Sequence, residues 1–210
     1  MKAFVLAEPG KVKWFDAPEP QLVPYGAILK PVAVTPCSSD VHTVFGGGSK
    51  KQDNLVLGHE CIAEVVSVGE NVCDFKAGDR VAVPAITPDW REKSIQEGND
   101  RHASAPFSGH QLGRTQPGVF SERFLIKDAD TTLAHIPQKI SEEQALMSVD
   151  VVTTGFTGAE YADIKIGDTV CVIGIGPIGL MAVAGAKLRG AARIIAVGTR
   201  PKCVQLAKYY

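Results

Sequence analysis

The chain has 210 residues, of which 45% are hydrophobic and 21% are charged, a composition typical of a folded soluble protein and not of a disordered one. Lys and Arg number 22 and Asp and Glu 23, which gives a net charge of −1. The sequence contains no cluster of Lys and Arg that would indicate nucleic acid or an anionic membrane as a partner. The N-terminus lacks a signal-peptide core, and the uncharged stretch 169–186 is interrupted by glycine and proline, unlike a membrane span. We therefore expect a cytoplasmic protein with no nucleic-acid or membrane partner.

The cysteines exclude two further classes. There are five of them, an odd number, and none forms a C-x-x-C pair. This argues against a disulfide framework and against a structural zinc site made of four cysteines. Reduced thiols are expected.

Residues 1–150 are predicted to form a β-rich domain. The predicted strands are Lys2–Leu6, Lys11–Phe15, Ala27–Val34, Cys61–Val68, Arg80–Val83, Phe120–Ile126 and Thr132–Ile136. Several short strands at such spacing indicate a barrel or a sandwich. A long loop is expected between Thr87 and Pro117, where Gly, Pro and polar residues dominate.

Residues 151–210 are predicted to begin a second, α/β domain. Ser141, with Gln144 three residues later, predicts a capped helix start, and the helical pattern continues to Ala162. The elements predicted next are strand Thr169–Ile173, helix Pro177–Arg189, strand Arg193–Val197 and helix Pro201–Tyr210. This order is typical of a parallel sheet with crossover helices.

A glycine turn joins the first of these strands to the helix that follows. Its residues are Gly174, Ile175, Gly176, Pro177, Ile178 and Gly179. In such a G-x-G-x-x-G turn the glycines permit a tight bend, close approach of a pyrophosphate and close helix packing, while the helix N-terminus attracts the phosphates. The turn therefore predicts dinucleotide binding. The alternative is a glycine turn that only packs a helix.

The end of the next strand indicates which dinucleotide binds. NAD enzymes place an acidic residue there, but this chain has Gly198, Thr199 and Arg200. A hydroxyl and a guanidinium can bind a 2′-phosphate, so NADP is favoured over NAD. The alternative makes Arg200 a solvated residue at a helix start.

Cys37 and His59 adjoin predicted strands. Taken alone, such residues are more often a buried thiol and a core imidazole than metal ligands. A resemblance reverses that interpretation. The stretches that carry it are Pro36–Val44, Leu57–Glu60, Asp74–Val81, Thr87–Trp90, Asp150–Phe156, Ile173–Met181, Gly185–Ala191 and Val197–Arg200. Through them the whole chain resembles zinc-dependent medium-chain alcohol dehydrogenases, in particular their NADP-linked secondary-alcohol branch from anaerobic bacteria and protists.

The resemblance implies a GroES-like β-barrel catalytic domain followed by a Rossmann domain. It implies one catalytic zinc per chain, held by Cys37, His59, Glu60 and Asp150, and a proton relay through Ser39 and His42. The last two could instead be an ordinary hydroxyl and imidazole near a loop. The implied activity is reversible hydride transfer between a secondary alcohol, or a ketone or aldehyde, and NADP(H). The implied assembly is a homotetramer of the full-length protein.

The chain departs from the family at two residues and in its length. Ala63 replaces a usual glycine, and His110 stands where many members have a bulky Trp, which bears on the substrate pocket. Members of the family are much longer, so we expect a truncated chain with an incomplete Rossmann domain and no activity by itself. Two alternatives remain open: a zinc-free relative similar to quinone reductases, and an inactive zinc-binding fragment.

Overall fold

The structure is a computed structural model that describes residues 1–46, 54–98 and 109–210. The chain divides into two compact units, Met1–Leu146 and Met147–Tyr210. The first unit thus ends at Leu146, a few residues before the domain boundary that was predicted after residue 150. No helix among the described residues is long and apolar enough to cross a bilayer.

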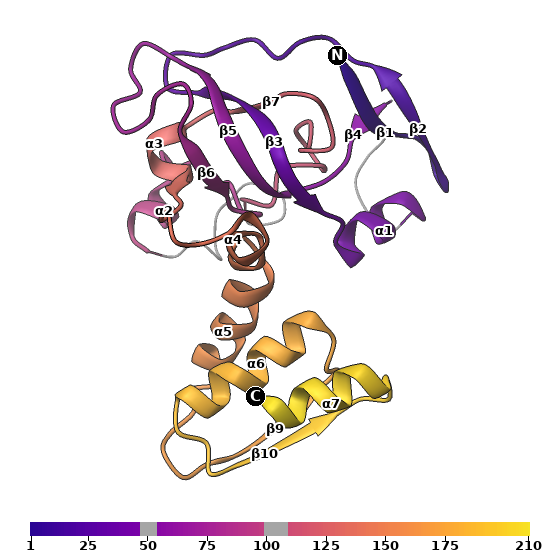
Figure 1. The fold of residues 1–210 in the computed structure, drawn as a ribbon, viewed down its shortest axis with the longest axis vertical. Helices are drawn as coiled ribbons and strands as arrows, with labels where there is room; N and C mark the ends of the chain where they lie inside the picture. The colour runs from indigo at the N-terminus through magenta and orange to yellow at the C-terminus, as the bar shows by residue number, and fades with distance from the viewer. Residues whose placement is uncertain (47–53, 99–108) are drawn as a thin grey trace. The chain divides into compact units, whose positions relative to one another are not determined.

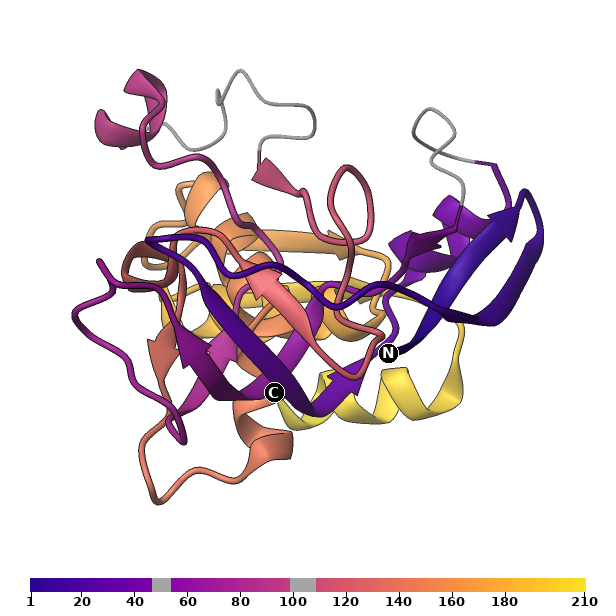
Figure 2. The same ribbon diagram turned by 90° about the horizontal axis from the view of Figure 1, so that it is seen from above.

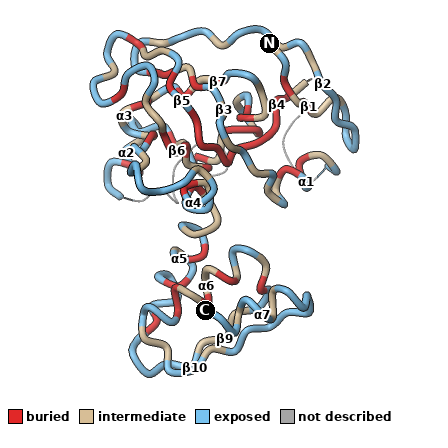
Figure 3. Tube along the Cα trace, viewed as in Figure 1, coloured by how far each residue is buried: buried red, intermediate tan, exposed pale blue. Residues whose placement is uncertain are grey.

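A five-stranded sheet with the order β7-β3-β5-β6-β8 forms the centre of the first unit. Its strands are β3 (Ala27–Thr35), β5 (Glu60–Val68), β6 (Arg80–Val83), β7 (Phe124–Ile126) and β8 (Ala134–His135). All neighbouring pairs are antiparallel. Alternate apolar residues from these strands, among them Leu29, Val65, Val81 and Phe124, are buried in one core. Figure 3 shows buried stretches in β5 and β6.

A second, three-stranded sheet has the order β2-β1-β4. It contains β1 (Lys2–Glu8), β2 (Lys11–Asp16) and the short β4 (Leu55–Val56). The β1–β2 hairpin turns at Gly10, whose φ of 78° is readily adopted only by glycine. In both ribbon views this hairpin lies beside the five-stranded sheet and not within it (Figures 1 and 2).

Two predicted strands were too long. The run Phe120–Ile126 is a strand only over Phe124–Ile126, because the hydroxyl of Ser121 donates a hydrogen bond to the carbonyl of Arg123 and the chain bends there. The run Thr132–Ile136 is a strand only over Ala134–His135, because Thr132 ends the helix α3 (Ala129–Thr132).

Three short helices in the described part of this unit were not predicted. Besides α3, they are α1 (Ser38–Val44) and α2 (Lys93–Gln96). α2 lies inside the stretch 87–117 that was predicted to be a loop, and the part of that stretch at 99–108 lies outside the described residues. Each of these helices is too short to show a clear helical period in the sequence.

The second unit follows the predicted α/β order. The helix α4 (Glu142–Ser148) spans the division between the units, and α5 (Val151–Tyr161), β9 (Thr169–Ile173), α6 (Pro177–Leu188), β10 (Arg193–Val197) and α7 (Pro201–Tyr209) come after it. β9 and β10 are parallel, as predicted. The capping box also forms, because the amide of Gln144 donates to the hydroxyl of Ser141 and the amide of Ser141 donates to the side-chain oxygen of Gln144.

The two-stranded sheet of this unit has one covered and one open face. Val172 and Ile194 pack with the buried Leu180 and Val183 of α6. On the opposite face Ile173 is 83% exposed, and Ile195 and Val197 are also exposed. The apolar side chains of β9 and β10 are therefore buried only on the side of α6.

Candidate metal and cofactor sites

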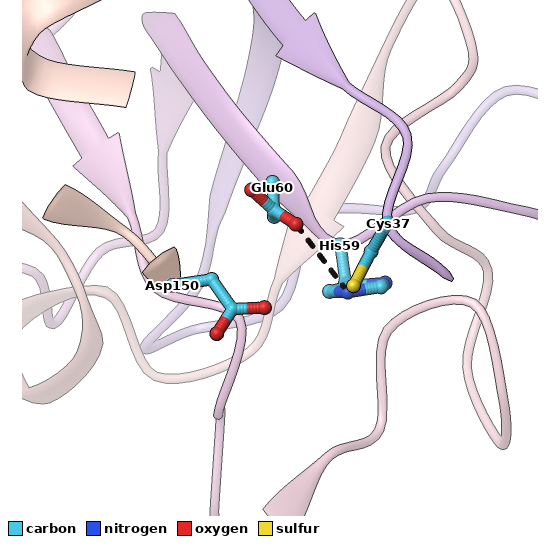
Figure 4. A group of neighbouring side chains, drawn as sticks. All are labelled: Cys37, His59, Glu60 and Asp150. Carbon is cyan, nitrogen blue, oxygen red and sulfur yellow. Dashed lines mark ion pairs between the residues drawn. The ribbon is translucent and has the colours of Figure 1, made fainter. Parts of the chain in front are cut away.

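The pairing of β3 with β5 brings Cys37 next to His59. Thr35, the last residue of β3, pairs with Glu60, the first residue of β5. Cys37 comes just after one strand and His59 just before the other, so both lie at the same end of the strand pair. The ligand atoms of Cys37, His59 and Glu60 lie within 4.8 Å of one another. Figure 4 draws these three side chains, together with Asp150 of the second unit.

The three donors fit a zinc ion by their chemistry. His59 and Glu60 are each only 2% exposed, and His59 Nε2 lies 3.9 Å from Glu60 Oε1. Buried ionisable groups are costly unless they are paired or bind a metal. Thiolate, imidazole and carboxylate are the usual donors to zinc. We call Cys37, His59 and Glu60 the donor cluster.

Asp40 is a residue of this site whose role the sequence analysis missed. Its carboxylate accepts hydrogen bonds from the amides of Cys37, at 2.9 Å, and Gly58, at 3.2 Å. It also lies 3.3 Å from His59 Nδ1. A carboxylate in this position fixes the imidazole orientation and leaves the other nitrogen for a metal. The available signal was an acidic residue three positions after Cys37.

These contacts change the pKa values in the cluster. The hydrogen bond with His59 lowers the pKa of Cys37 to about 7, although partial burial opposes it. Burial by itself lowers the pKa of His59, but hydrogen bonds to Asp40 and Cys37 outweigh it and raise the pKa to about 10. The thiolate, which is the form that binds metals, is therefore populated near neutral pH.

Three other polar residues, Ser39, His42 and His110, differ in how they lie relative to the cluster. Ser39 Oγ lies 3.4 Å from His59 Nε2. His42 lies three residues later on α1, with its side chain exposed. The ring of His110 packs edge-on against the His59 ring, with 4.5 Å between centroids. Ser39 and His110 thus contact the cluster directly, and His42 is on the solvent side of α1.

Asp150 belongs to the second unit, where it is the N-cap residue of α5. Its side-chain Oδ1 accepts a hydrogen bond of 2.5 Å from the Thr154 hydroxyl, and its carbonyl accepts one of 2.8 Å from the Thr154 amide. These bonds fix the start of α5. The role of Asp150 as a zinc ligand stays a prediction.

The glycine turn has the conformation that a dinucleotide-binding turn needs. Gly174 has a φ of 91°, which side chains other than glycine rarely adopt. Gly176 is the N-cap residue of α6 and Pro177 its first residue. A Cβ at Gly179 would overlap the carbonyl oxygen of Gly174, so the third glycine lets the helix pack closely. Ile178 is the half-exposed second residue of α6.

Gly198, Thr199 and Arg200 lie at the same sheet edge as the glycine turn. Val197 pairs with Ile173, so the carboxyl ends of the parallel strands β9 and β10 are adjacent. A nitrogen of the Arg200 guanidinium lies 3.1 Å from the position that a Cβ on Gly176 would occupy. A cationic group therefore stands beside the turn, and no described residue at the end of β10 is acidic.

Comparisons with known proteins agree with this geometry. The sequence profile of the family described as "Alcohol dehydrogenase GroES-like domain" matches residues 24–138. The chain is 55% identical over 210 residues to the NADP-dependent isopropanol dehydrogenase of Thermoanaerobacter brockii and 50% identical to that of Clostridium beijerinckii. Each alignment covers 100% of this chain and 60% of the relative.

Solved structures give the same result. The apo zinc-dependent alcohol dehydrogenase 2 of Streptococcus pneumonia superimposes with a TM-score of 0.88 at 29% identity, covering 100% of this chain and 59% of that one. Alcohol dehydrogenase TADH of Thermus sp. ATN1 also gives a TM-score of 0.88, at 27% identity, covering 100% and 61%. The predicted fold class, a GroES-like domain followed by the beginning of a Rossmann domain, is confirmed.

The chain spans about 60% of the length of the curated relatives that it matches. The profile match covers more than half of the chain, and it includes His59, Glu60 and Cys37 of the donor cluster. The chain therefore belongs to the alcohol dehydrogenase family with a GroES-like domain, as its resemblance indicated.

Proposed function

We propose that this chain is the catalytic domain and the first part of the cofactor domain of an NADP-linked, zinc-dependent secondary alcohol dehydrogenase. The observation that carries the proposal is the donor cluster at the junction of β3 and β5, where three zinc-binding groups lie within 4.8 Å of one another. Among the described residues, no second group of His, Cys, Asp or Glu side chains is placed to bind a metal ion. We therefore expect one zinc per chain.

The ligands of the zinc would be Cys37, His59, Glu60 and Asp150. The donor cluster supplies a thiolate, an imidazole and a carboxylate, and Asp150 supplies a second carboxylate at the N-terminus of α5. Catalytic zinc sites keep an open or exchangeable position, and the resemblance assigns this role to Glu60. Bound zinc supplies a Lewis acid that lowers the pKa of an alcohol hydroxyl.

The proton leaves through residues of α1. Ser39 is half-buried with its hydroxyl next to His59 Nε2, where it can accept the proton of the substrate hydroxyl. His42 is about one helical turn further along α1 and is exposed to solvent. Ser39 would therefore relay the proton, releasing its own hydroxyl proton toward His42 as it accepts that of the substrate, and His42 would pass it to water.

NADP would be held along the edge formed by the glycine turn and the end of β10. The amides at the start of α6 would bind its pyrophosphate, and Thr199 and Arg200 would bind its 2′-phosphate. Bound NADP⁺ would supply the hydride acceptor for oxidation of a secondary alcohol to a ketone, with the alcohol's proton released to solvent, and NADPH would supply the hydride for the reverse reduction. The resemblance further supports a cytoplasmic homotetramer as the full-length form.

A chimaera tests the activity without depending on an incomplete cofactor domain. Residues 1–210 are joined to the remaining C-terminal part of the Thermoanaerobacter brockii relative, with which this chain shares 55% identity. We expect about one zinc per chain and oxidation of 2-propanol that depends on NADP⁺. Cys37→Ala in the chimaera should remove both the zinc and the activity.

The outcomes separate this function from its alternatives. A folded chimaera without zinc that still oxidises NADPH with a quinone supports the zinc-free reductase. A folded chimaera that binds zinc but turns over no alcohol supports an inactive zinc-binding unit. Either result contradicts the proposal.

A further inference from the structure

Arg80, on β6, binds three acceptors in the segment that leads into α4. Its Nη1 donates to Glu142 Oε1 at 2.7 Å. Its Nη2 donates to the carbonyl oxygens of Ile140, at 2.8 Å, and Pro137, at 3.2 Å. One guanidinium therefore holds the last residues before α4 and the first residue of the helix itself.

The geometry of this contact requires arginine. The planar guanidinium presents its donors in a fixed fork, whereas a lysine ammonium is a single compact charge on a flexible stem. The side chains of Arg80 and Glu142 are 32% and 34% exposed, so both partners are partly shielded from water. Lysine at position 80 would keep the charge but could not reach all three acceptors.

Arg80 lies on the strand next to β5, the strand that begins at Glu60 of the donor cluster. It pairs with Glu64 of β5, and Val83 pairs with Cys61 near the start of that strand. His59 and Glu60 stand at this start. On the other side, Glu142 opens α4, whose first turn is also fixed by the capping box of Ser141 and Gln144. The chain reaches Asp150 two residues after α4 ends.

We propose that Arg80 is a positioning residue for the metal site. By fixing the first turn of α4 to β6, it determines where the chain delivers Asp150, so that this carboxylate joins Cys37, His59 and Glu60 as a ligand. The inference rests on the ligand set given under the proposed function. Arg80 itself would contact neither the metal nor the substrate, and it would act on Asp150 only through α4.

Metal binding by the chain Met1–Tyr210 tests the proposal without an activity assay. The variants are Arg80→Lys, Asp150→Ala and the double variant, and zinc affinity is measured by competition with a chromophoric chelator. Removal of a group that orients a metal ligand typically lowers metal affinity 10- to 100-fold. We expect a loss of about tenfold or more in Arg80→Lys and in Asp150→Ala, and no further loss in the double variant, because both changes remove the same ligand.

The visible spectrum of the cobalt-substituted chain gives a second measurement. It reports the ligand set and does not respond to a general loss of stability. The spectrum of Arg80→Lys should resemble that of Asp150→Ala. Glu142→Gln keeps the acceptor oxygen and loses only its charge, so it should fold normally and show a smaller shift in the same direction.

Lys76→Gln is the matched control. It removes an exposed ion pair with Asp79 in the turn before β6 and should leave zinc affinity and the cobalt spectrum unchanged. The positioning role is overturned if Asp150→Ala weakens zinc binding while Arg80→Lys and Glu142→Gln do not, or if the two losses add in the double variant. If Asp150→Ala itself has no effect, the ligand set of the proposed function is wrong.

Discussion

At the scale of single residues, one carboxylate organises the donor cluster. Asp40 accepts the amides of Cys37 and Gly58 and contacts His59 Nδ1. It therefore joins the two segments that carry the thiol and the imidazole. Its pKa is lowered because interaction with His59 outweighs the opposing effect of burial, so it is ionised at neutral pH and can hold the Nδ1 proton.

Asp40→Asn tests this role. The amide keeps the volume of the side chain but loses the charge and one acceptor oxygen, so His59 is oriented less strongly. We expect zinc affinity, measured by chelator competition, to fall about 10- to 100-fold. Asp16→Asn, which alters an exposed partner of Lys2, should bind zinc like the unchanged chain. Unchanged affinity in Asp40→Asn would show that the carboxylate is not needed for orientation.

Arg200 is the residue on which cofactor choice depends. In the chimaera, Arg200→Ala should weaken NADPH binding by roughly 1.5–3 kcal/mol, the usual contribution of a charge-assisted hydrogen bond, and leave NADH binding nearly unchanged. Adding Gly198→Asp should reverse the preference, because a carboxylate repels the 2′-phosphate. Calorimetric titration with both nucleotides measures this. Arg193→Ala, at the other end of β10, is the control, and equal affinities before any substitution would refute the assignment of NADP.

At the scale of elements, the packing of α5 on α6 depends on small residues. Gly155 of α5 is buried, and a Cβ there would overlap Met181 and lie 2.7 Å from the carbonyl oxygen of Ile178. A Cβ at Gly185 of α6 would lie 3.0 Å from side-chain atoms of both Ala159 and Phe156 of α5, which is tighter than an ordinary contact. The two helices can therefore approach each other closely only where glycine removes the side chain.

Two glycines of α5 should respond to alanine with opposite signs. Gly158 is exposed and has open space around its Cβ position, so Gly158→Ala should stabilise the chain by about 0.5–1 kcal/mol through helix propensity. Gly155→Ala should destabilise it, because backbone atoms of α6 must move. Urea unfolding of both variants followed by circular dichroism measures the difference. Stabilisation by Gly155→Ala would contradict the close packing of α5 on α6.

At the scale of the molecule, the second unit has an exposed apolar surface on the open face of the β9–β10 sheet. Parallel sheets are normally covered on both faces, but Ile173, Ile195 and Val197 are exposed. Such a surface promotes association.

The chain Met1–Tyr210, produced by itself, should therefore self-associate and oxidise no 2-propanol. Light scattering over a range of concentrations should show mass rising with concentration. Ile173→Thr with Val197→Thr should reduce this rise while zinc content stays the same, and Ile166→Thr, at an exposed residue outside the sheet, serves as the control. A monomer that turns over alcohol would contradict both expectations.

The sequence by itself determined those features that depend on local chemistry. The strands Arg80–Val83, Thr169–Ile173 and Arg193–Val197 follow from short runs of β-branched residues, and their predicted bounds agree with the structure. The glycine turn follows from the need for a positive φ at Gly174, and the start of α4 follows from the pairing of Ser141 with Gln144. Each of these signals lies within a few residues of the feature that it predicts.

Only the tertiary structure decided how the donors meet. Cys37 and His59 are far apart in the chain, and only the antiparallel pairing of Thr35 with Glu60 makes them neighbours. α1 is too short to produce a period in the sequence, so neither the helix nor the position of Asp40 between Cys37 and His59 could be predicted from local pattern. The residue types of the cluster were evident from the resemblance to a family. Their orientation depends on hydrogen bonds between distant segments, and such bonds exist only in the folded chain.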